Sequence, residues 1–482
     1  MKVQASALKT SPARRVLAVA AVFVLLRGVL PPPPLAGSPP TPSKNKLLGY
    51  LTARIDNSTV AILDDRIQLA QGGRVELRDA SGGKASGFTD LAAGQFVEAE
   101  GVWVGRHQFS ADKISVETGL LEKSIHETVY LQDEPMDAPK ILSGDPAELK
   151  ADGEWLVIGP KTHRQWPPQN ATQASEAKPG TGDPSAPAAL HYAGHQVRYS
   201  GFRREDGRIE TDLVELHPPA PPDAYNMPHG MSVVSAKELQ TGIEILEFKR
   251  GTKVDGRLKL FPVPAVQQYV ADLGTSLIPK SEAGITRTLE FRFFVIEDPS
   301  INAQALPDGT VLVNTGLLGA VDNEAALAFV LSHEIAHVLQ VHYWREVRET
   351  RGQRIGLTIA GLAGSYFIGD VSIFLSELGM AAVVNGHQRA LENQADRLGL
   401  QTMIERGYDP RQAPHFLRII IERYGDRSTS KLWSNHDSSV LRGSFLAVQI
   451  DHEYPQGRFD SARVDTRAFQ AMREAMGPVK IE

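Results

Sequence analysis

The chain has 482 residues, 42% of them hydrophobic and 22% charged, so it fits about three globular domains and is neither wholly disordered nor a protein with many membrane spans. Its formal net charge is −6 at pH 7 and it has no strongly basic run, so we expect no nucleic-acid partner. The absence of cysteine excludes disulfides, thiolate metal sites and cysteine nucleophiles, and any metal ion must therefore be held by His, Asp or Glu.

Residues 1–37 have the pattern of an export signal followed by a proline-rich segment. Basic residues precede the apolar run Val16–Leu26, and the prolines at 31–34 cannot continue a helix. A helix of this length reaches only about half of the roughly 30 Å hydrocarbon core. We expect a cleaved signal peptide, with an uncleaved membrane anchor as the alternative. In both cases the rest of the chain is exported, to the periplasm or cell envelope of a bacterium.

Short alternating runs in residues 45–122 and 123–217 predict two small β-barrel domains. Residues 193–202 repeat the pattern of residues 93–102, and each copy holds a glycine inside a strand and precedes a turn and a second strand. Such a glycine is typical of a bulge or a barrel corner, and the pattern resembles OB-like envelope domains. Their aromatic residues lie among acidic ones, which favours docking of a substrate or of an outer-membrane or envelope assembly partner over nucleic-acid binding.

The proline-rich residues 218–231 are expected to link these domains to a C-terminal domain over residues 232–482. Within that domain, the stretch from Ala325 to Arg345 has no glycine or proline, and its apolar residues recur at helical spacing. It predicts a helix with a buried face and with Asp322 as the N-cap. This helix carries the first of two chemically informative motifs.

The first motif is the H-E-x-x-H sequence from His333 to His337. Histidines at i and i+4 share one face of a helix, so both imidazoles can reach one cation. Glu334 is offset from that face and is placed to take a proton from water activated by the metal. The competing interpretation is a pair of core histidines, but these polar groups would need unusual hydrogen bonding in an apolar helix. His342 would lie about 140° round the helix from His337 and is a poor ligand for the same metal.

The second motif is Glu392–Asp396, in a helix-like stretch over residues 388–406. Glu392 can complete a set of two histidines and one glutamate, which leaves a fourth position open. Asp396, one turn further on, can accept a hydrogen bond from the far nitrogen of a ligand histidine and fix its tautomer. Alone, the two carboxylates would more simply be surface residues, so their interpretation depends on the upstream motif.

These motifs lie within three longer segments, Asn323–Val338, Glu392–Gly399 and Gly407–Pro410. Together the segments resemble the HtpX-like and CAAX-prenyl-protease family of zinc endopeptidases, in its soluble periplasmic branch, over about residues 232–450. The resemblance implies an α+β fold, in which a mainly helical metallopeptidase domain has a small β-sheet beside the active-site helix. Residues 291–297 and 311–314 match strands of that sheet.

The resemblance also implies roles for individual residues. It implies one Zn²⁺ ion per chain, held by His333, His337 and Glu392, with Glu334 as the general base. Residues 302–307 would lead into an edge strand that aligns the substrate backbone by β-augmentation.

The family carries a later His-Pro motif, where this chain has His436 without the proline and then Arg442. The resemblance implies that His436 lies at the mouth of the site and that Arg442, which matches the family's following arginine, lies with Asp396 behind the metal ligands. His436 would either bind the open metal position and silence the enzyme, or donate a hydrogen bond to the oxyanion during attack. A surface-loop histidine without a role at the site is the remaining alternative.

Residues 355–384 are apolar and rich in glycine, and membrane members of the family have spans in this part of the chain. Asp370 interrupts the run after about 15 apolar residues, short of the roughly 20 needed to span a membrane. We expect two short helices that form a lid or a hairpin in peripheral contact with the membrane, with burial against the catalytic core as the alternative.

The motifs together predict a zinc-dependent endopeptidase of the bacterial envelope, which hydrolyses misfolded or unassembled envelope proteins in protein quality control. The alternative is an exported chaperone-like or binding scaffold whose peptidase site is repressed. The intact general base, Glu334, argues against a vestigial site. Zinc-dependent cleavage of a polypeptide discriminates between the two hypotheses.

Overall fold

The computed structural model describes most of the compact unit that begins at Asn45. Its description covers residues 45–481 except for the following segments: 80–81, 118–123, 133–137, 152–153, 166–192, 205–207, 228–229, 238–241, 280–288, 346–387 and 425–438. The predicted export signal, the predicted hairpin at 355–384 and His436 lie outside the described residues. Within the described part, none of the helices is long and apolar enough to cross a membrane.

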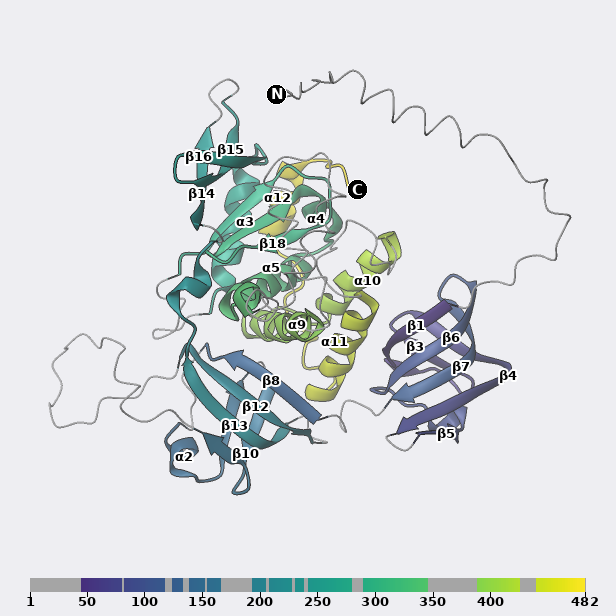
Figure 1. Ribbon diagram of the computed structural model, residues 1–482. Helices are drawn as coiled ribbons and strands as arrows, with labels where there is room; N and C mark the ends of the chain where they lie inside the picture. Colours follow the sequence, from purple (N-terminus) through teal and green to yellow (C-terminus); the bar gives the residue numbers. More distant parts are fainter. Residues whose placement is uncertain are drawn as a thin grey trace, which may run out of the picture. The chain divides into compact units, whose positions relative to one another are not determined.

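The first sheet is formed entirely by residues before position 118 (Figure 1). Its strands follow the order β1-β6-β7-β4-β3-β2, and β5 pairs with β4. The elements are β1 (Asn45–Tyr50), β2 (Ala53–Arg54), β3 (Thr59–Ile62), β4 (Asp65–Asp79), β5 (Gly82–Ser86), the 3-10 helix η1 (Phe88–Asp90), β6 (Phe96–Gly105) and β7 (Gln108–Glu117).

The second sheet follows the order β8-β12-β13-β10-β9, and β11 pairs with β13. Its elements are β8 (Ser124–Tyr130), helix α2 (Ala138–Ser143), β9 (Ala147–Ala151), β10 (Glu154–Ile158), β11 (His163–Gln165), β12 (His195–Arg203) and β13 (Ile209–Pro219). The 3-10 helix η3 (Pro222–Tyr225) follows. Each sheet has its own apolar core.

The two sheets share one topology, as the repeat in the sequence predicts. In each sheet the first strand pairs antiparallel with a second, which pairs antiparallel with a third, and the third pairs parallel with a fourth. The register shifts at Gly101 in β6 and at Gly201 in β12. A Cβ atom would lie 2.0 Å from the Ser110 carbonyl oxygen at the first glycine and 2.2 Å from that of Glu210 at the second. Only glycine therefore fits these bulges.

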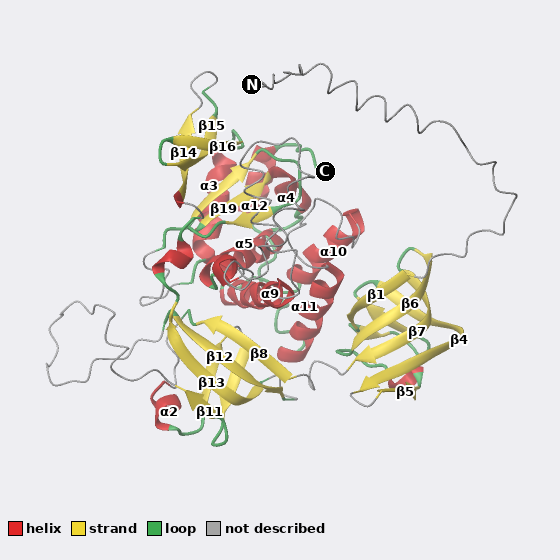
Figure 2. Cartoon of the chain, in the orientation of Figure 1, coloured by secondary structure: helices red, strands yellow, loops and turns green. Residues whose placement is uncertain are grey.

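The C-terminal part combines two three-stranded sheets with most of the helices (Figure 2). One sheet has the order β14-β15-β16, which the sequence reading did not predict, and the other has the order β17-β19-β18. The strands are β14 (Met231–Lys237), β15 (Glu244–Arg250), β16 (Lys253–Lys259), β17 (Arg292–Ile296), β18 (Ala303–Ala305) and β19 (Thr310–Asn314). The helices are α3 (Pro264–Leu277), α4 (Thr315–Ala320), α5 (Glu324–Leu339), α9 (Gln388–Glu405), α10 (Gln412–Tyr424), α11 (Ser439–Glu453) and α12 (Arg467–Met476). This mixture of helices and sheets agrees with the predicted α+β class.

Helix α5 is the centre of this part, because nearly all of its residues are buried. Its N-cap is Asn323, whose side chain accepts a hydrogen bond from the Ala326 amide at 2.9 Å. The prediction of Asp322 as the N-cap was therefore wrong by one residue. The Glu324 carboxylate in the first turn accepts hydrogen bonds from the hydroxyls of Tyr269 (2.6 Å) and Tyr408 (2.7 Å). These contacts anchor the start of the helix.

Helix α5 also ends earlier than the sequence predicts. The last helical residue is Leu339, and Val341 has a φ of 46°, a left-handed conformation that costs a β-branched residue about 1–3 kcal/mol. Residues 342–345 then return to helical conformation. The continuous helix predicted up to Arg345 is therefore broken, and the break changes where His342 lies.

Candidate active site

Helices α5 and α9 approach each other closely at the H-E-x-x-H motif. Gly399 of α9 faces the backbone of His333, and a Cβ atom at Gly399 would lie 3.1 Å from the His333 amide nitrogen. The absence of a side chain lets the two helices come together. As a result, Glu392 of α9 lies beside the two histidines of α5.

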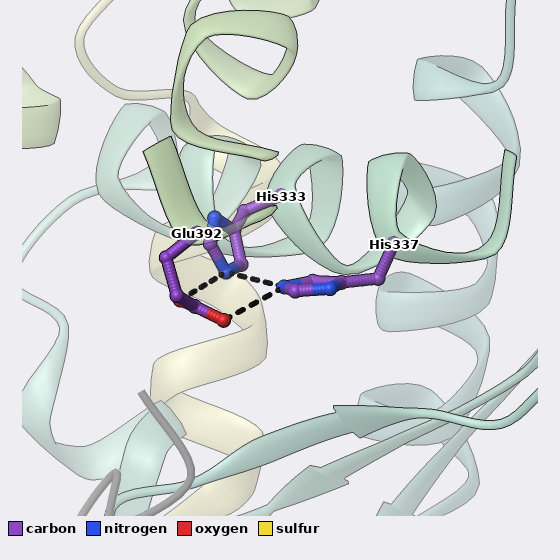
Figure 3. A group of neighbouring side chains, drawn as sticks. All are labelled: His333, His337 and Glu392. Carbon is purple, nitrogen blue, oxygen red and sulfur yellow. Dashed lines mark hydrogen bonds and ion pairs between the residues drawn. The ribbon is translucent and has the colours of Figure 1, made fainter. Parts of the chain in front are cut away.

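The ligand atoms of His333, His337 and Glu392 converge on one point (Figure 3). The two histidine Nε2 atoms are 3.0 Å apart. Glu392 Oε2 lies 3.5 Å from Nε2 of His333, and Oε1 lies 3.4 Å from Nε2 of His337. Ligand atoms at about 2.0–2.2 Å from one tetrahedral zinc ion lie about 3.3–3.5 Å from each other. The donor set and its spacing therefore fit a zinc ion.

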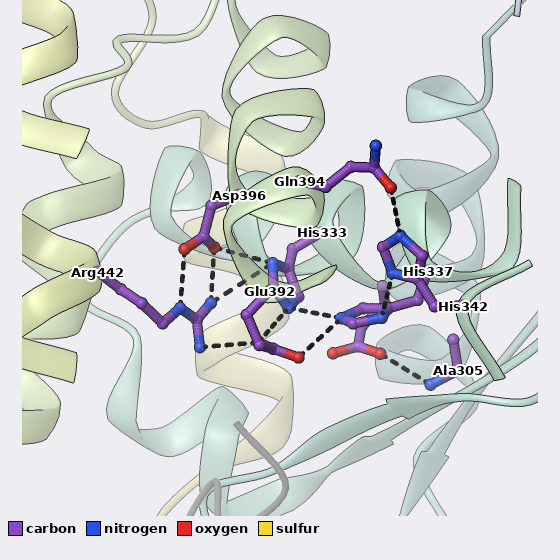
Figure 4. A network of polar contacts seen from close by, with 9 residues as sticks. Ala305, His333, His337, His342, Glu392, Gln394, Asp396 and Arg442 are labelled. Atoms are coloured by element: carbon purple, nitrogen blue, oxygen red, sulfur yellow. Dashed lines mark hydrogen bonds and ion pairs between the residues drawn. The ribbon is translucent and has the colours of Figure 1, made fainter. Parts of the chain in front are cut away.

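Asp396 contacts the ring nitrogen of His333 that points away from the other two candidate ligands, and Arg442 in turn binds Asp396 (Figure 4). His333 Nδ1 lies 2.9 Å from Asp396 Oδ1, so Nδ1 donates its hydrogen and leaves Nε2 available to a metal. Arg442 donates to both Asp396 oxygens, from Nε at 2.8 Å and from a terminal nitrogen at 2.6 Å. The other terminal nitrogen lies 3.3 Å from Glu392 Oε2. One buried guanidinium therefore supports two of the three candidate ligands.

The charges of this cluster set its protonation. Burial would raise the pKa of Asp396, but the charge and hydrogen bonds of Arg442 lower it below its usual range. Burial would lower the pKa of His333, but hydrogen bonds to Asp396 and Glu392 raise it to about 9. A proton therefore occupies the metal-free site at neutral pH, and a metal ion must displace that proton to bind.

Glu334 lies next to the cluster and is almost completely buried. Its Oε2 accepts a hydrogen bond from the backbone amide of Ala305 in β18 at 2.8 Å. Burial raises the pKa of Glu334 to about 7, although the nearby charge of His333 opposes this. This pKa suits a group that both takes up and releases a proton near neutral pH.

His337 is supported from its other side by His342. The Nδ1 atoms of the two rings are 2.9 Å apart, and His342 Nε2 lies 2.8 Å from Gln394 Oε1. Burial and the nearby Arg345 lower the pKa of His342 to about 3, so this ring is neutral at pH 7. The sequence prediction that His342 is a poor ligand assumed a continuous helix and missed its contact with His337.

The part of the chain that carries this site is similar to a known peptidase family. Residues 264–449 match peptidase family M48. The chain carries a peptidase family M48 domain. This confirms the family predicted from the two motifs. The M48 domain begins at α3 and includes α5, α9 and Arg442 of α11.

The chain is also similar to curated proteases. It is 34% identical to the beta-barrel assembly-enhancing protease of Yersinia pestis over 168 residues, which are 33% of this chain and 34% of that protein. It is 35% identical to a putative beta-barrel assembly-enhancing protease of Vibrio cholerae over 222 residues, 44% of this chain and 41% of that protein. It is 31% identical to the mitochondrial metalloendopeptidase OMA1 of Arabidopsis thaliana over 160 residues, 33% of this chain and 31% of that protein. The matches span less than half the length of each relative.

The structure brings together all the predicted site residues of the M48 domain that it describes. These residues are His333, Glu334, His337, Glu392, Asp396 and Arg442. His436 falls in a segment outside the described residues, so its role stays a prediction. The sequence did not indicate that His342 contacts His337 or that Gln394 contacts His342, although Gln394 stands inside the second motif.

Replacing Asp396 with alanine tests the support of His333 in the M48 domain. We expect Asp396→Ala to weaken zinc binding by about 10–100-fold, because His333 loses the acceptor that fixes its tautomer. Competition with a chromophoric chelator measures the affinity. Asp409→Ala is the matched control, because Asp409 is also buried and pairs with an arginine, Arg411, at 2.8 Å. Equal zinc affinities for both variants and the wild type would contradict the role of Asp396.

Proposed function

We propose that this chain is a zinc-dependent endopeptidase that hydrolyses peptide bonds of envelope proteins. The observation that carries the proposal is the convergence of His333, His337 and Glu392 beside the buried Glu334, inside an M48 domain. His333, His337 and Glu392 would hold one zinc ion. When bound, zinc supplies Lewis acidity that polarises a peptide carbonyl and makes nearby water more acidic.

Glu334 is the proposed general base. It would take a proton from the attacking water and then pass that proton to the nitrogen of the leaving amine. The pKa of about 7 allows both transfers near neutral pH, since the carboxylate is neither strongly acidic nor permanently protonated. The Ala305 amide holds one carboxylate oxygen and so orients the group.

The strand β18 is the proposed platform for the substrate. It lies at the edge of its sheet, with β19 as its neighbour, and the Ala305 amide joins it to Glu334. An extended polypeptide that pairs with this edge would run directly past the proposed base. The hydrogen bond from the Ala305 amide to the Glu334 carboxylate therefore aligns β18 with the proposed base.

The wider role is proposed from the relatives and from the sequence. One of them is named beta-barrel assembly-enhancing protease and another putative beta-barrel assembly-enhancing protease, which supports misfolded or unassembled envelope polypeptides as substrates of this chain in quality control. The predicted signal over residues 1–37 supports export to the periplasm or cell envelope. Peripheral membrane contact through residues 355–384 is part of the same proposal.

The N-terminal sheets are proposed to be OB-like barrel domains over residues 45–122 and 123–217, joined by the linker 218–231 to the peptidase domain at 232–482. Their shared strand order and their glycine bulges support this assignment. We propose that they dock a substrate or an envelope assembly partner. The side chains exposed on their strands include Trp103, Trp155 and Phe202.

The test is cleavage of a polypeptide by the full chain, with casein and an unfolded outer-membrane protein as substrates. We expect cleavage that stops when a chelator removes the metal and returns when zinc is added. Mapping the products gives the cleavage preference. A chain that binds zinc and suppresses aggregation of the unfolded protein, yet yields no products, would favour the alternative of a chaperone-like scaffold with a repressed peptidase site.

A further inference from the structure

The break at the end of α5 changes the surroundings of the second candidate ligand histidine. In an uninterrupted helix, His342 would point about 140° away from His337. The left-handed Val341 (φ 46°) instead brings His342 Nδ1 to 2.9 Å from His337 Nδ1. Figure 4 shows the two rings in contact, with Gln394 beyond them. A strained residue at such a place points to a function for the geometry that it creates.

A chain of hydrogen bonds continues from His342 to the second sheet. Gln394 Nε2 donates to the backbone carbonyl of Thr128 in β8 at 3.0 Å. Because a carbonyl can only accept, the amide oxygen of Gln394 must face the other way, toward His342 Nε2 at 2.8 Å. Arg345 donates to the same oxygen at 2.8 Å, which confirms this orientation. We call the chain His337–His342–Gln394–Thr128 the β8 relay.

The β8 relay fixes where the hydrogens of both rings lie. Nε2 of His342 must carry a hydrogen to meet the Gln394 oxygen, and Nδ1 of the same imidazole is then left as the acceptor. His337 Nδ1 must then donate to it, and the lone pair of His337 Nε2 faces His333 and Glu392. This is the tautomer that a metal ligand needs.

We propose that His342 and Gln394 are positioning residues for the metal ligand His337, and that β8 of the second sheet is through them part of the metal site. The inference rests on the proposed zinc site. Each ligand histidine then has its own support: Asp396 and Arg442 of α11 orient His333, whereas the β8 relay orients His337. The second sheet is thereby a structural component of the catalytic centre as well as a docking unit.

A second glutamine provides a matched control. Gln340, at the end of α5, accepts a hydrogen bond from the Tyr130 amide at 2.7 Å and donates to the Tyr130 carbonyl at 2.9 Å. It is fully buried and joins the same helix to the same strand β8. Both side-chain hydrogen bonds go to the Tyr130 backbone, so its removal weakens the contact between sheet and helix without touching the β8 relay.

The experiment measures the zinc affinity of the full chain by competition with a chromophoric chelator. We expect His342→Phe and Gln394→Leu each to bind zinc about 10–100-fold more weakly than the wild type. The zinc affinity of the double variant should lie within about twofold of that of the single variant with the lower affinity, because both residues act through one chain of contacts. Gln340→Leu should stay within about twofold of the wild type.

A conservative variant and a spectroscopic measurement complete the test. His342→Gln keeps an oxygen that can accept from His337, and it should retain most of the affinity. In the zinc-loaded wild type, histidine ¹⁵N shifts should show hydrogen on Nδ1 of His337 and on Nε2 of His342, a measurement that requires no variant to fold.

Three results would overturn the β8 relay: wild-type affinity in His342→Phe, equal weakening by Gln340→Leu and Gln394→Leu, or the opposite tautomer of His342. Failure of the proposed function looks different. In that case the wild-type chain itself binds no zinc, and the relay falls with it. Zinc binding by the wild type with unchanged variants rejects the relay alone.

Discussion

Glu334→Gln should abolish peptide hydrolysis and leave the metal site intact. The substitution removes the only proposed base, for which we expect a loss of at least about 10²–10⁴-fold in kcat. A glutamine oxygen can still accept from the Ala305 amide, as Glu334 does at 2.8 Å, so the fold and the β18 contact should persist. Cleavage of an unfolded outer-membrane protein measures the activity, and zinc stoichiometry measures the site.

Activity and zinc stoichiometry together distinguish a base from a metal ligand. Loss of zinc in Glu334→Gln would assign this residue to the ligand set and contradict its role as base. Cleavage at the wild-type rate would place the base elsewhere. The activity of the wild type should rise with pH as Glu334 loses its proton. Any residual activity of Glu334→Gln should show no such rise.

Glu392→Ala should remove the metal from the site. The variant leaves two histidines and no third ligand, so the loss of affinity should exceed the about 10–100-fold expected for a supporting residue. It also leaves Arg442 without its 3.3 Å contact to Glu392, although Asp396 still pairs with that guanidinium. Zinc content after dialysis and competition with a chelator provide the measurement.

Glu324→Ala is the matched control for this variant. Glu324 is a carboxylate about as buried as Glu392 and belongs to the first turn of α5, where it accepts hydrogen bonds from the hydroxyls of Tyr269 and Tyr408. Its removal should lower thermal stability while each folded molecule retains one zinc ion. If Glu392→Ala binds zinc as tightly as the wild type, the third ligand lies elsewhere.

The sequence was sufficient for the parts of the site that depend on helical spacing. His333 and His337 share a face because they are one turn apart, and Glu392 and Asp396 share a face for the same reason. Whether the two helices meet is a tertiary property, which the residues alone did not determine. The resemblance to a family supplied that link, and the close approach at Gly399 provides its physical basis.

The break in α5 was not predictable from local signals. Neither glycine nor proline stands between His337 and Arg345, so propensity favours a continuous helix. The break is held by contacts with a distant part of the chain, because Val341 packs against Tyr130 and Ala224. Tertiary contacts therefore override local preference, and the role of His342 could not be read before the second sheet was in place.

Helix α11 has a wider consequence, because its 15 residues contact three separate structures. Arg442 binds Asp396 behind the metal site, Ser444 accepts a hydrogen bond from the Tyr50 amide of the first sheet, and Glu453 lies 4.0 Å from Arg203 of the second sheet. The ribosome makes both sheets long before it makes this helix. The support of the candidate metal site therefore stays incomplete until α11 has been synthesised, because this helix brings Arg442 to Asp396 and also contacts both sheets.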